Sequence, residues 1–197
     1  MRKDIKNEII EATIKLIEEK GSDPSSITIG DICSRVGIGV GLINYHFQTK
    51  DNLIRQSVRR IISNARLMTD EERERLRDVP PKEKLRIFMK LNCDYLVRNE
   101  NISRISIQTD MANDELHDNT RETVDAYLPL VYKAYAGEFT EEDLKRRMYM
   151  LILTVQNIFL RPALLKDQTG MDFYDPQHRS ELVDGLVDCY FGRITGI

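Results

Sequence analysis

The strongest constraint on this chain is a helical periodicity that runs along nearly its whole length. Apolar residues recur at spacings of three and four, and no convincing run alternates apolar and polar residues as a half-buried strand would. In the first segment Ile10, Ile14 and Ile17 fall on one face, while Lys and Glu occupy the rest. The pattern predicts an all-α fold.

Turn and capping residues divide the pattern into separate helices. Thr28, with Asp31 three residues later, forms a capping signature for the second helix, and Gly37 ends that helix. Thr49 is the expected N-cap of the fourth helix, and Pro162 is expected to bend or end the long helix near the C-terminus. The predicted helices cover residues 4–20, 28–36, 40–47, 50–68, 82–99, 102–115, 120–136, 141–166 and 176–192.

Composition excludes several classes of protein. The 197 residues are 41% hydrophobic and 31% charged, which argues against disorder and against a membrane protein. The longest near-apolar stretch, Met148–Val155, is far shorter than the roughly 20 residues of a membrane-spanning helix, and Met1–Lys20 lacks the apolar region of a signal peptide. Cys33, Cys93 and Cys189 are too far apart for a CxxC metal site or a disulfide framework. We therefore expect a cytoplasmic protein without a membrane partner.

The charge distribution separates a head from a body. Residues 1–60 hold 10 Lys and Arg against 8 Asp and Glu, whereas residues 61–197 hold 19 against 24, and the net charge is −3. A mildly basic head on an acidic body is compatible with DNA contact confined to the head. The difference is small, so charge alone is a weak signal.

The most informative motif is the pair of short helices on either side of Gly37. Two helices of about eight residues joined by a short turn that contains Gly form a helix-turn-helix, whose second helix reads base edges in the major groove. The same spacing is also found in tight helical corners that bind nothing. The residues around the motif are therefore needed to distinguish a DNA-binding helix-turn-helix from a helical corner without a ligand.

The sequence from Gly37 to Leu53, GIGVGLINYHFQTKDNL, resembles the DNA-binding signature of the TetR-like (TetR/AcrR) transcriptional regulators. In that family the stretch reads approximately Gly-Val-Ser-x-Gly-Thr-Leu-Tyr-x-His-Phe, followed by Ser or Asn, Lys, Glu and Leu. The upstream ITIGDIC also resembles the start of the family's second helix. The resemblance covers roughly residues 5–55, and glycines, aromatics, caps and lysine recur in register.

The resemblance implies DNA contacts at matching positions. Four residues are expected against or near the sugar-phosphate backbone, namely Thr28, Tyr45, His46 and Lys50. Lys50 also has a direct physical reason, since it adds a cation where the amides of a helix N-terminus attract phosphate. Roles without DNA contact remain open for these residues. Lys50 could be an ordinary surface lysine, and Tyr45 and His46 could be packing residues of the helical corner. Ile43 and Phe47 are expected in the core.

The positions that would read bases depart from the family. Gly39 stands where Ser is common, Leu42 where Thr is common and Asn44 where Tyr is common, whereas Gly41 matches. Val40 and Leu42 offer only apolar contact, as with a thymine methyl, and Asn44 suits adenine N6 and N7. We expect Gly39, Val40, Gly41, Leu42 and Asn44 to face the bases and to favour an A·T-leaning half-site.

The resemblance also implies a division of the chain. We expect residues 1–50 to form a three-helix, helix-turn-helix DNA-binding head, with the helix of about 50–68 as a connector. Residues 69–197 would form a larger helical body for effector binding and dimerisation. The expected function is a ligand-responsive regulator, more often a repressor than an activator, that binds a palindromic double-stranded DNA operator as a homodimer.

The last predicted helices carry wide apolar faces. Rows at spacing four on the terminal helix predict either internal core or a subunit interface, and the resemblance implies a four-helix contact between two copies. The interface is expected at Leu151, Val155, Leu182, Leu186 and Tyr190.

Polar residues inside apolar stretches of the body suggest an effector pocket. A few polar groups in an apolar cavity orient a small ligand, and Met side chains repack around varied ligands. Each polar group is equally compatible with solvent exposure or a satisfied core position. The expected pocket residues are Met89, Asn92, Gln108, Met111, Tyr127, Met148 and Asn157.

Signals for catalysis are sparse. The three histidines lie in separate segments without a metal-binding spacing, and the carboxylate-rich stretch 110–118 is more simply a charged helix end. We therefore expect no enzyme activity, no cofactor and no metal. Two alternatives remain open: a helical small-molecule carrier or adaptor without sequence-specific DNA binding, and an architectural DNA-binding protein indifferent to sequence.

Overall fold

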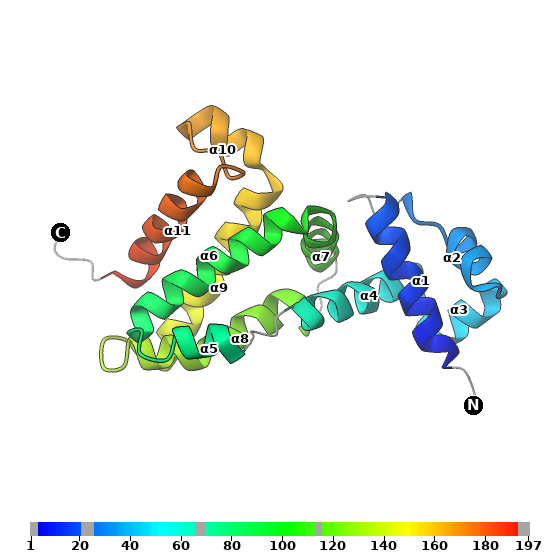
Figure 1. The fold of residues 1–197 in the computed structure, drawn as a ribbon, viewed down its shortest axis with the longest axis horizontal. Helices are drawn as coiled ribbons and strands as arrows, with labels where there is room; N and C mark the ends of the chain where they lie inside the picture. The colour runs from blue at the N-terminus through cyan, green and yellow to red at the C-terminus, as the bar shows by residue number, and fades with distance from the viewer. Residues whose placement is uncertain (1–3, 21–25, 66–69, 113–115, 193–197) are drawn as a thin grey trace. The chain divides into compact units, whose positions relative to one another are not determined.

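The computed structural model describes residues 4–20, 26–65, 70–112 and 116–192, and it divides into two compact units (Figure 1). The first unit comprises Met1–Met68 with Asn99–Asp114, and the second comprises Thr69–Arg98 with Glu115–Ile197. The described residues form helices and no strand, which confirms the all-α prediction. The predicted functional division at residues 50 and 69 stays a prediction.

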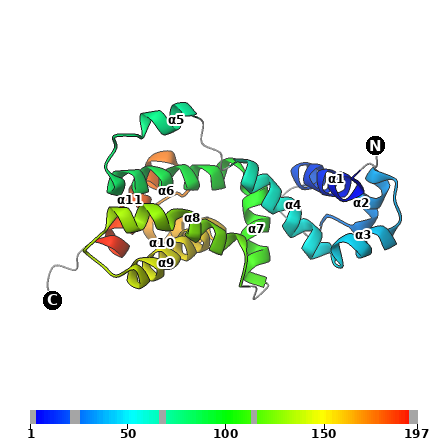
Figure 2. The same cartoon turned by 90° about the horizontal axis from the view of Figure 1, so that it is seen from below.

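In the first unit, five helices share one apolar core (Figure 2). Ile9, Ile17, Ile32, Ile43 and Phe47 are fully buried there, because the apolar stripes of the short helices all turn inward. Residues 66–68 and 113–115, at the ends of two predicted helices, lie outside the described part. The helices are α1 (Ile5–Lys20), α2 (Ile29–Val36), α3 (Val40–Phe47), α4 (Lys50–Ala65) and α7 (Glu100–Ala112).

Helix α7 belongs to this core although the sequence pattern assigned it to the body. It packs on α1 and α4, and its Ile102 and Ile105 join the cluster formed by the head helices. Both helices bury a serine: Ser57 of α4 is fully buried and donates to Leu53 O at 2.9 Å, and Ser103 of α7 is 2% exposed.

In the second unit, α6, α8, α9 and α11 pack against one another. Helix α5 was not predicted, since its sequence is almost entirely charged and carries no apolar stripe. The predicted bend at Pro162 is confirmed, because the helical axis turns by 90° there and Pro162 begins a new helix. The helices are α5 (Asp70–Arg75), α6 (Pro81–Arg98), α8 (Asn119–Ala134), α9 (Glu141–Leu160), α10 (Pro162–Thr169) and α11 (Pro176–Phe191).

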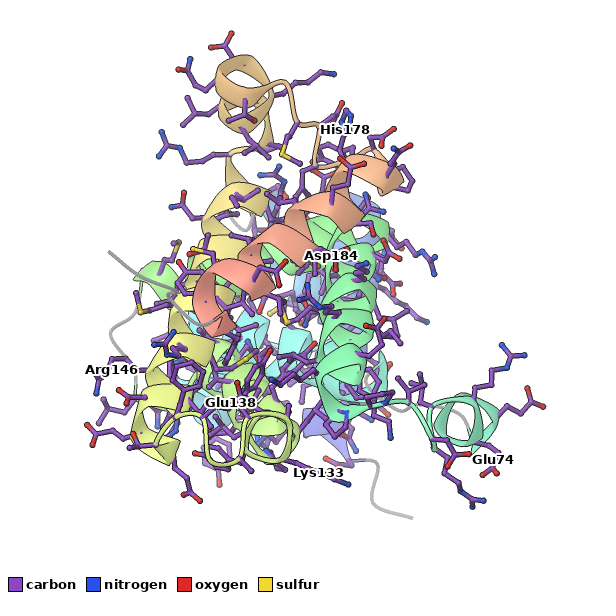
Figure 3. All side chains as sticks on the ribbon, turned by 90° about the vertical axis from the view of Figure 1, so that its left-hand side faces the viewer. Glu74, Lys133, Glu138, Arg146, His178 and Asp184 are labelled. Carbon is purple, nitrogen blue, oxygen red and sulfur yellow. The ribbon has the colours of Figure 1, made fainter. Side chains whose placement is uncertain are left out.

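Ion pairs hold α11 to α6. Arg179 is 6% exposed and donates through Nε and Nη2 to Asp94 Oδ1 at 2.9 and 2.6 Å, while its Nη1 donates to the carbonyls of Phe173 and Tyr174. Further along, Lys90 Nζ lies 2.7 Å from Asp184 Oδ2, and Figure 3 shows Asp184 on α11 pointing towards α6. Because Arg179 is buried with its donors satisfied, it fixes where α11 begins.

Among the described helices, none by itself is long and apolar enough to cross a membrane. Taken together, α9 and α10 have the length and composition of a membrane-spanning segment, but the pair is bent by 90° at Arg161.

Candidate nucleic-acid interface

Helix α2 begins at a reciprocal cap. Asp31 N donates to Thr28 Oγ1 at 3.1 Å, and Thr28 N donates to Asp31 Oδ2 at 3.0 Å, as the sequence predicts. The Thr28 hydroxyl also donates to Asp31 Oδ2 at 2.6 Å, and Lys20 Nζ lies 2.6 Å from the same oxygen. These bonds hold the pKa of Asp31 well below its usual range, with the Lys20 hydrogen bond as the largest cause and those from Thr28 next.

The turn between α2 and α3 depends on Gly37. Its φ of 76° lies in the left-handed region that glycine adopts at little cost, and its N–H donates to Cys33 O at 2.8 Å. Ile38 N donates to the same carbonyl at 3.1 Å, and Ile38 packs on the core of the unit. The chain therefore reverses in two residues and starts α3 at Gly39, its N-cap.

Helix α3 has one buried side and one solvent side. Ile43 and Phe47 are fully buried, as expected, and Leu42 and His46 are half-buried. Successive residues of an α-helix are about 100° apart, so positions 40, 41, 44, 45 and 48 lie on the opposite side. All five are exposed, with Val40 at 48% and Tyr45 at 81%.

The junction between α3 and α4 is a strained turn. Gln48 has φ 65° and ψ −50°, and Thr49 N donates across it to Phe47 O at 2.7 Å. This is a γ-turn of the rare positive-φ kind. Thr49 Oγ1 then accepts from Asn52 N at 3.1 Å, which confirms Thr49 as the cap of α4 and puts Lys50 in the first helical position.

The four residues predicted to contact the DNA backbone differ in the exposure of their side chains and in the contacts that these already make. Tyr45 is exposed, and its ring meets His46 edge-on at 5.0 Å between centroids. The Thr28 hydroxyl is engaged in the cap of α2, so donation to a phosphate would require it to leave Asp31. Lys50 is half-buried at the start of α4. Contact of these four residues with DNA stays a prediction.

Other cations of the head are neutralised within it. Lys20 pairs with Asp31 at 2.6 Å, and Arg60 lies 3.3 Å from Glu11. Arg35 pairs with Glu19 at 2.7 Å. The surface near the α2–α3 turn therefore carries less net positive charge than the count of Lys and Arg suggests.

Lys6 is a candidate DNA-contact residue that the sequence analysis did not predict. It is exposed on α1, and its Nζ lies 5.7 Å from the centre of the Phe47 ring, at the C-terminal end of α3. Its proximity to α3 depends on how α1 packs, which a local motif does not contain. Its position adds a cation beside the helix that carries the predicted reading residues.

Gly39 and Gly41 are not required by the fold. A Cβ added at either position would meet no atom within 4 Å, and neither residue has a positive φ. Glycine inside a helix costs about 0.5–1 kcal/mol relative to alanine. Gly41 therefore carries a cost that no contact within the folded chain explains, and it leaves the backbone of α3 open to close approach.

The residues predicted for the dimer interface separate into two groups. Leu151 and Val155 are buried within the second unit and are not available on its surface. Leu182, Leu186 and Tyr190 are half-buried on α11, and the Tyr190 hydroxyl lies 2.7 Å from Thr154 Oγ1 on α9. The exposed apolar residues of α9 are Met150, at 49%, and Leu153, at 47%.

The seven residues predicted for an effector pocket do not form one group in the structure. Met89 and Met148 are fully buried, Asn92 and Tyr127 are half-buried, and Gln108, Met111 and Asn157 are exposed. Gln108 and Met111 lie in the first unit, whereas the other five lie in the second. The Tyr127 hydroxyl donates to Phe88 O at 3.0 Å.

The second unit has an open hollow of about 510 Å³ at another place, between the start of α6 and the end of α11. Lys82 lies above the Tyr135 ring, 4.7 Å from its centre, and pairs with Glu138, which Figure 3 labels. Arg86 pairs with Asp188 at the same hollow. Its cations are thus engaged by carboxylates, and none of the seven predicted residues lines it.

Among the described residues, no three His, Cys, Asp or Glu side chains gather as a metal site would require. Residues 113–115 of the carboxylate-rich stretch lie outside the described part.

Comparison with known proteins gives partial matches in sequence and broad matches in fold. Residues 9–56 match the family described as bacterial regulatory proteins, tetR family. The HTH-type transcriptional regulator BetI of Pseudomonas paraeruginosa is 28% identical over 89 residues, which are 45% of this chain and 44% of that protein. BetI of Pectobacterium atrosepticum is 29% identical over 89 residues, 45% of each chain. The match thus spans less than half the length of these curated relatives.

Two solved structures share the fold over nearly the whole chain. A TetR transcriptional regulator from Rhodococcus sp. RHA1 superposes with a TM-score of 0.60 at 16% identity, over 95% of both chains. NalD, the secondary repressor of the MexAB-OprM multidrug efflux pump in Pseudomonas aeruginosa, gives 0.54 at 22% identity, over 97% of both. At these identities the likeness concerns the fold. The head of the chain thus matches the tetR family of bacterial regulatory proteins over residues 9–56, and the whole chain shares its fold with solved TetR-type regulators.

Proposed function

We propose that this chain is a ligand-responsive, DNA-binding transcriptional repressor that acts in the cytoplasm as a homodimer on a palindromic operator and is released by a small-molecule effector. The observation that carries the proposal is the solvent side of α3, which follows a Gly37 turn and a capped α2 and exposes Val40, Asn44 and Tyr45. A recognition helix enters the major groove with such a side.

The surroundings of α3 suit a phosphate backbone. Lys50 begins α4, where free amides and a cation act together on an anion. Tyr45 presents its hydroxyl to solvent, and Lys6 adds a cation from α1. Because Lys20, Arg35 and Arg60 pair with carboxylates within the head, we expect only a few phosphate contacts from each copy and a moderate dependence on salt.

A homodimer accounts for the outer faces of α9 and α11. Each helix already buries one side in its own unit, yet Met150 and Leu153 remain about half exposed, and Leu186 and Gly185 lie on the surface of α11. A two-fold contact between these faces buries apolar area that a single copy leaves in water. Such a dimer would carry two copies of α3 for the two half-sites of a palindrome.

The relatives support the regulatory reading. The curated relatives are named transcriptional regulators, and one structural neighbour is described as a repressor. We place the effector site in the second unit, where Thr120 and Gln156 form a buried pair between α8 and α9, with Gln156 Nε2 donating to Thr120 Oγ1 at 3.0 Å. Buried polar groups of this kind orient small ligands. We propose no catalytic reaction for the chain.

Selection of binding sites from a random DNA pool tests the proposal. The selected duplex and a scrambled duplex are then titrated by fluorescence anisotropy at two salt concentrations. We expect saturable binding that prefers the selected duplex and weakens with salt. Lys50→Ala should weaken binding to both duplexes and reduce the salt slope by about 2, one for each copy in the homodimer, whereas Lys145→Ala, an exposed lysine of α9, should change neither.

Failure to enrich any sequence would contradict the proposal and favour the carrier or adaptor reading. Equal binding to both duplexes would instead favour an architectural DNA-binding protein.

A further inference from the structure

The solvent side of α3 has an unusual chemical composition for a recognition surface. Its five positions are Val40, Gly41, Asn44, Tyr45 and Gln48, with no cation and no carboxylate among them. Guanine is most often read by Arg or Lys donating to O6 and N7, and cytosine by a carboxylate that accepts from N4. The exposed side of α3 provides neither group.

The groups that are present on this side of α3 match an A·T base pair. An Asn amide pairs with adenine N6 and N7, because it offers one acceptor and one donor in the plane that adenine requires. Apolar branched side chains contact the C5-methyl group of thymine. Asn44 is exposed, and its amide makes no side-chain hydrogen bond with the described residues, so it is available to a base.

Position along the helix separates Asn44 from the second amide. Recognition helices contact base edges through their N-terminal residues. Asn44 lies one turn after Val40, whereas Gln48 is the C-cap and takes the positive-φ turn into α4. Val40 and Asn44 are about 6 Å apart along the helix axis, against about 3.4 Å between base pairs, so together they span about two base pairs.

The free backbone at Gly41 completes the arrangement. It lies between Val40 and Asn44 in the sequence, and a Cβ there would meet nothing within the folded chain. The absence of a Cβ at Gly41 lets α3 lie deep enough in the major groove for the two short side chains, Val40 and Asn44, to reach base edges. Longer side chains such as Arg would not need that approach.

We propose that α3 selects A·T base pairs within each half-site, with Asn44 pairing with an adenine and Val40 contacting the methyl group of a thymine within two base pairs of it. This inference rests on the proposed DNA-binding function and specifies what that function reads. Leu42, which the sequence also predicts to face the bases, is half-buried, and we do not include it in the proposed contact.

Modified duplexes test the two contacts one atom at a time. Starting from the selected duplex, deoxyuridine in place of one thymidine removes the methyl group, and 7-deazaadenine in place of one adenine removes N7. For wild-type protein we expect one thymidine and one adenine position per half-site at which affinity falls by about 5- to 30-fold, as one lost base contact implies.

Protein variants assign each loss to a residue. Val40→Ala should bind the deoxyuridine and thymidine duplexes equally, and Asn44→Ala should bind the 7-deazaadenine and adenine duplexes equally. Gln48→Ala, which removes the other exposed amide of this side, should keep both losses. Circular dichroism of each variant verifies that the helices are intact, so a loss of DNA binding is not mistaken for unfolding.

The possible results separate this inference from the function on which it rests. Sequence-specific binding to half-sites whose sensitive positions are G·C pairs would overturn the inference and leave the proposed function standing. The same holds if the two atomic losses persist in Val40→Ala and Asn44→Ala. A selection that enriches no sequence at all would overturn both.

Discussion

Arg35 in the last turn of α2 donates two hydrogen bonds to Glu19 of α1, from Nη1 to Oε1 at 2.9 Å and from Nη2 to Oε2 at 2.7 Å. This paired geometry fixes the first helix of the motif on α1. The hydrogen bond from Arg35 lowers the pKa of Glu19, and the same bond raises the pKa of Arg35. Arg35, two residues before Gly37, is thus paired within the head.

Replacement of Gly41 by alanine should separate stability from DNA binding. Because the added methyl group meets no atom of the folded chain, Gly41→Ala should raise the free energy of unfolding by about 0.5–1 kcal/mol. The same methyl group would hold α3 away from the groove, so affinity for the selected duplex should fall. Urea denaturation and anisotropy measure the two effects.

Gly30→Ala is the matched control, since Gly30 also lies in the first turn of a short head helix and its added Cβ would make only an ordinary contact, 3.6 Å from Thr28 Oγ1. A similar loss of DNA affinity in both variants would contradict a special role for Gly41.

The strained turn at Gln48 predicts a stabilising substitution. A residue with a Cβ at φ 65° and ψ −50° costs about 1–3 kcal/mol, and Gly relieves this at an entropic cost of about 0.5–1 kcal/mol in the unfolded chain. Gln48→Gly should therefore raise the free energy of unfolding by about 1 kcal/mol. Gln48→Ala keeps the Cβ and should give no gain. Equal stabilities of the two variants in urea would show that the turn is not strained.

The cap of α2 predicts a pH-dependent contribution to stability. The pKa of Asp31 is lowered in the folded chain, so its carboxylate stabilises the head in full above its ordinary pKa of 3.8. That contribution is lost as the pH falls from 3.8 towards the folded pKa. Asp31→Asn should thus lower the thermal midpoint of unfolding at neutral pH, with a difference from wild type that shrinks in acid.

Thermal scans between about pH 7 and pH 2 measure this difference, with Glu18→Gln as a control carboxylate on the exposed side of α1. A difference that stays constant with pH would exclude Asp31 as its source.

The proposed dimer predicts that one charge on α9 separates the copies. Leu153→Glu puts a carboxylate in the apolar contact, where it would be desolvated without a partner. Light scattering should give a dimer for wild type and a monomer for this variant, and the monomer should bind the palindrome more weakly. Leu91→Glu changes an equally exposed leucine on α6 and should remain dimeric. A dimeric Leu153→Glu would place the interface elsewhere.

Local chemistry made much of the head predictable. Thr28 and Asp31 are a capping pair at fixed spacing, and Gly37 is the residue that a left-handed C-cap favours, so both ends of α2 follow from the sequence. The positive φ of Gln48 did not follow, because glutamine carries no preference for it. The pairing of Arg35 with Glu19 and the position of Lys6 beside Phe47 depend on how α1 packs.

The body was less predictable because its helices are apolar on more than one side. Along α9 Leu151 and Val155 are buried whereas Met150 and Leu153 are exposed, although all four are apolar. Periodicity identifies a helix with apolar sides but does not say which side meets its own unit and which meets a partner. The membership of α7 in the first core likewise depends on tertiary packing.

Sequence reading by α3 is tested most directly by two affinities of the wild-type protein, one for a selected palindrome and one for a scrambled duplex. Both are measured at about 150 mM salt, where non-specific phosphate binding is weak, and their ratio is compared. We predict a ratio of about 10³ or more, which falls towards 1 when Val40 and Asn44 are both replaced by alanine. A ratio near 1 for the wild-type protein would contradict it, because α3 would then read no sequence.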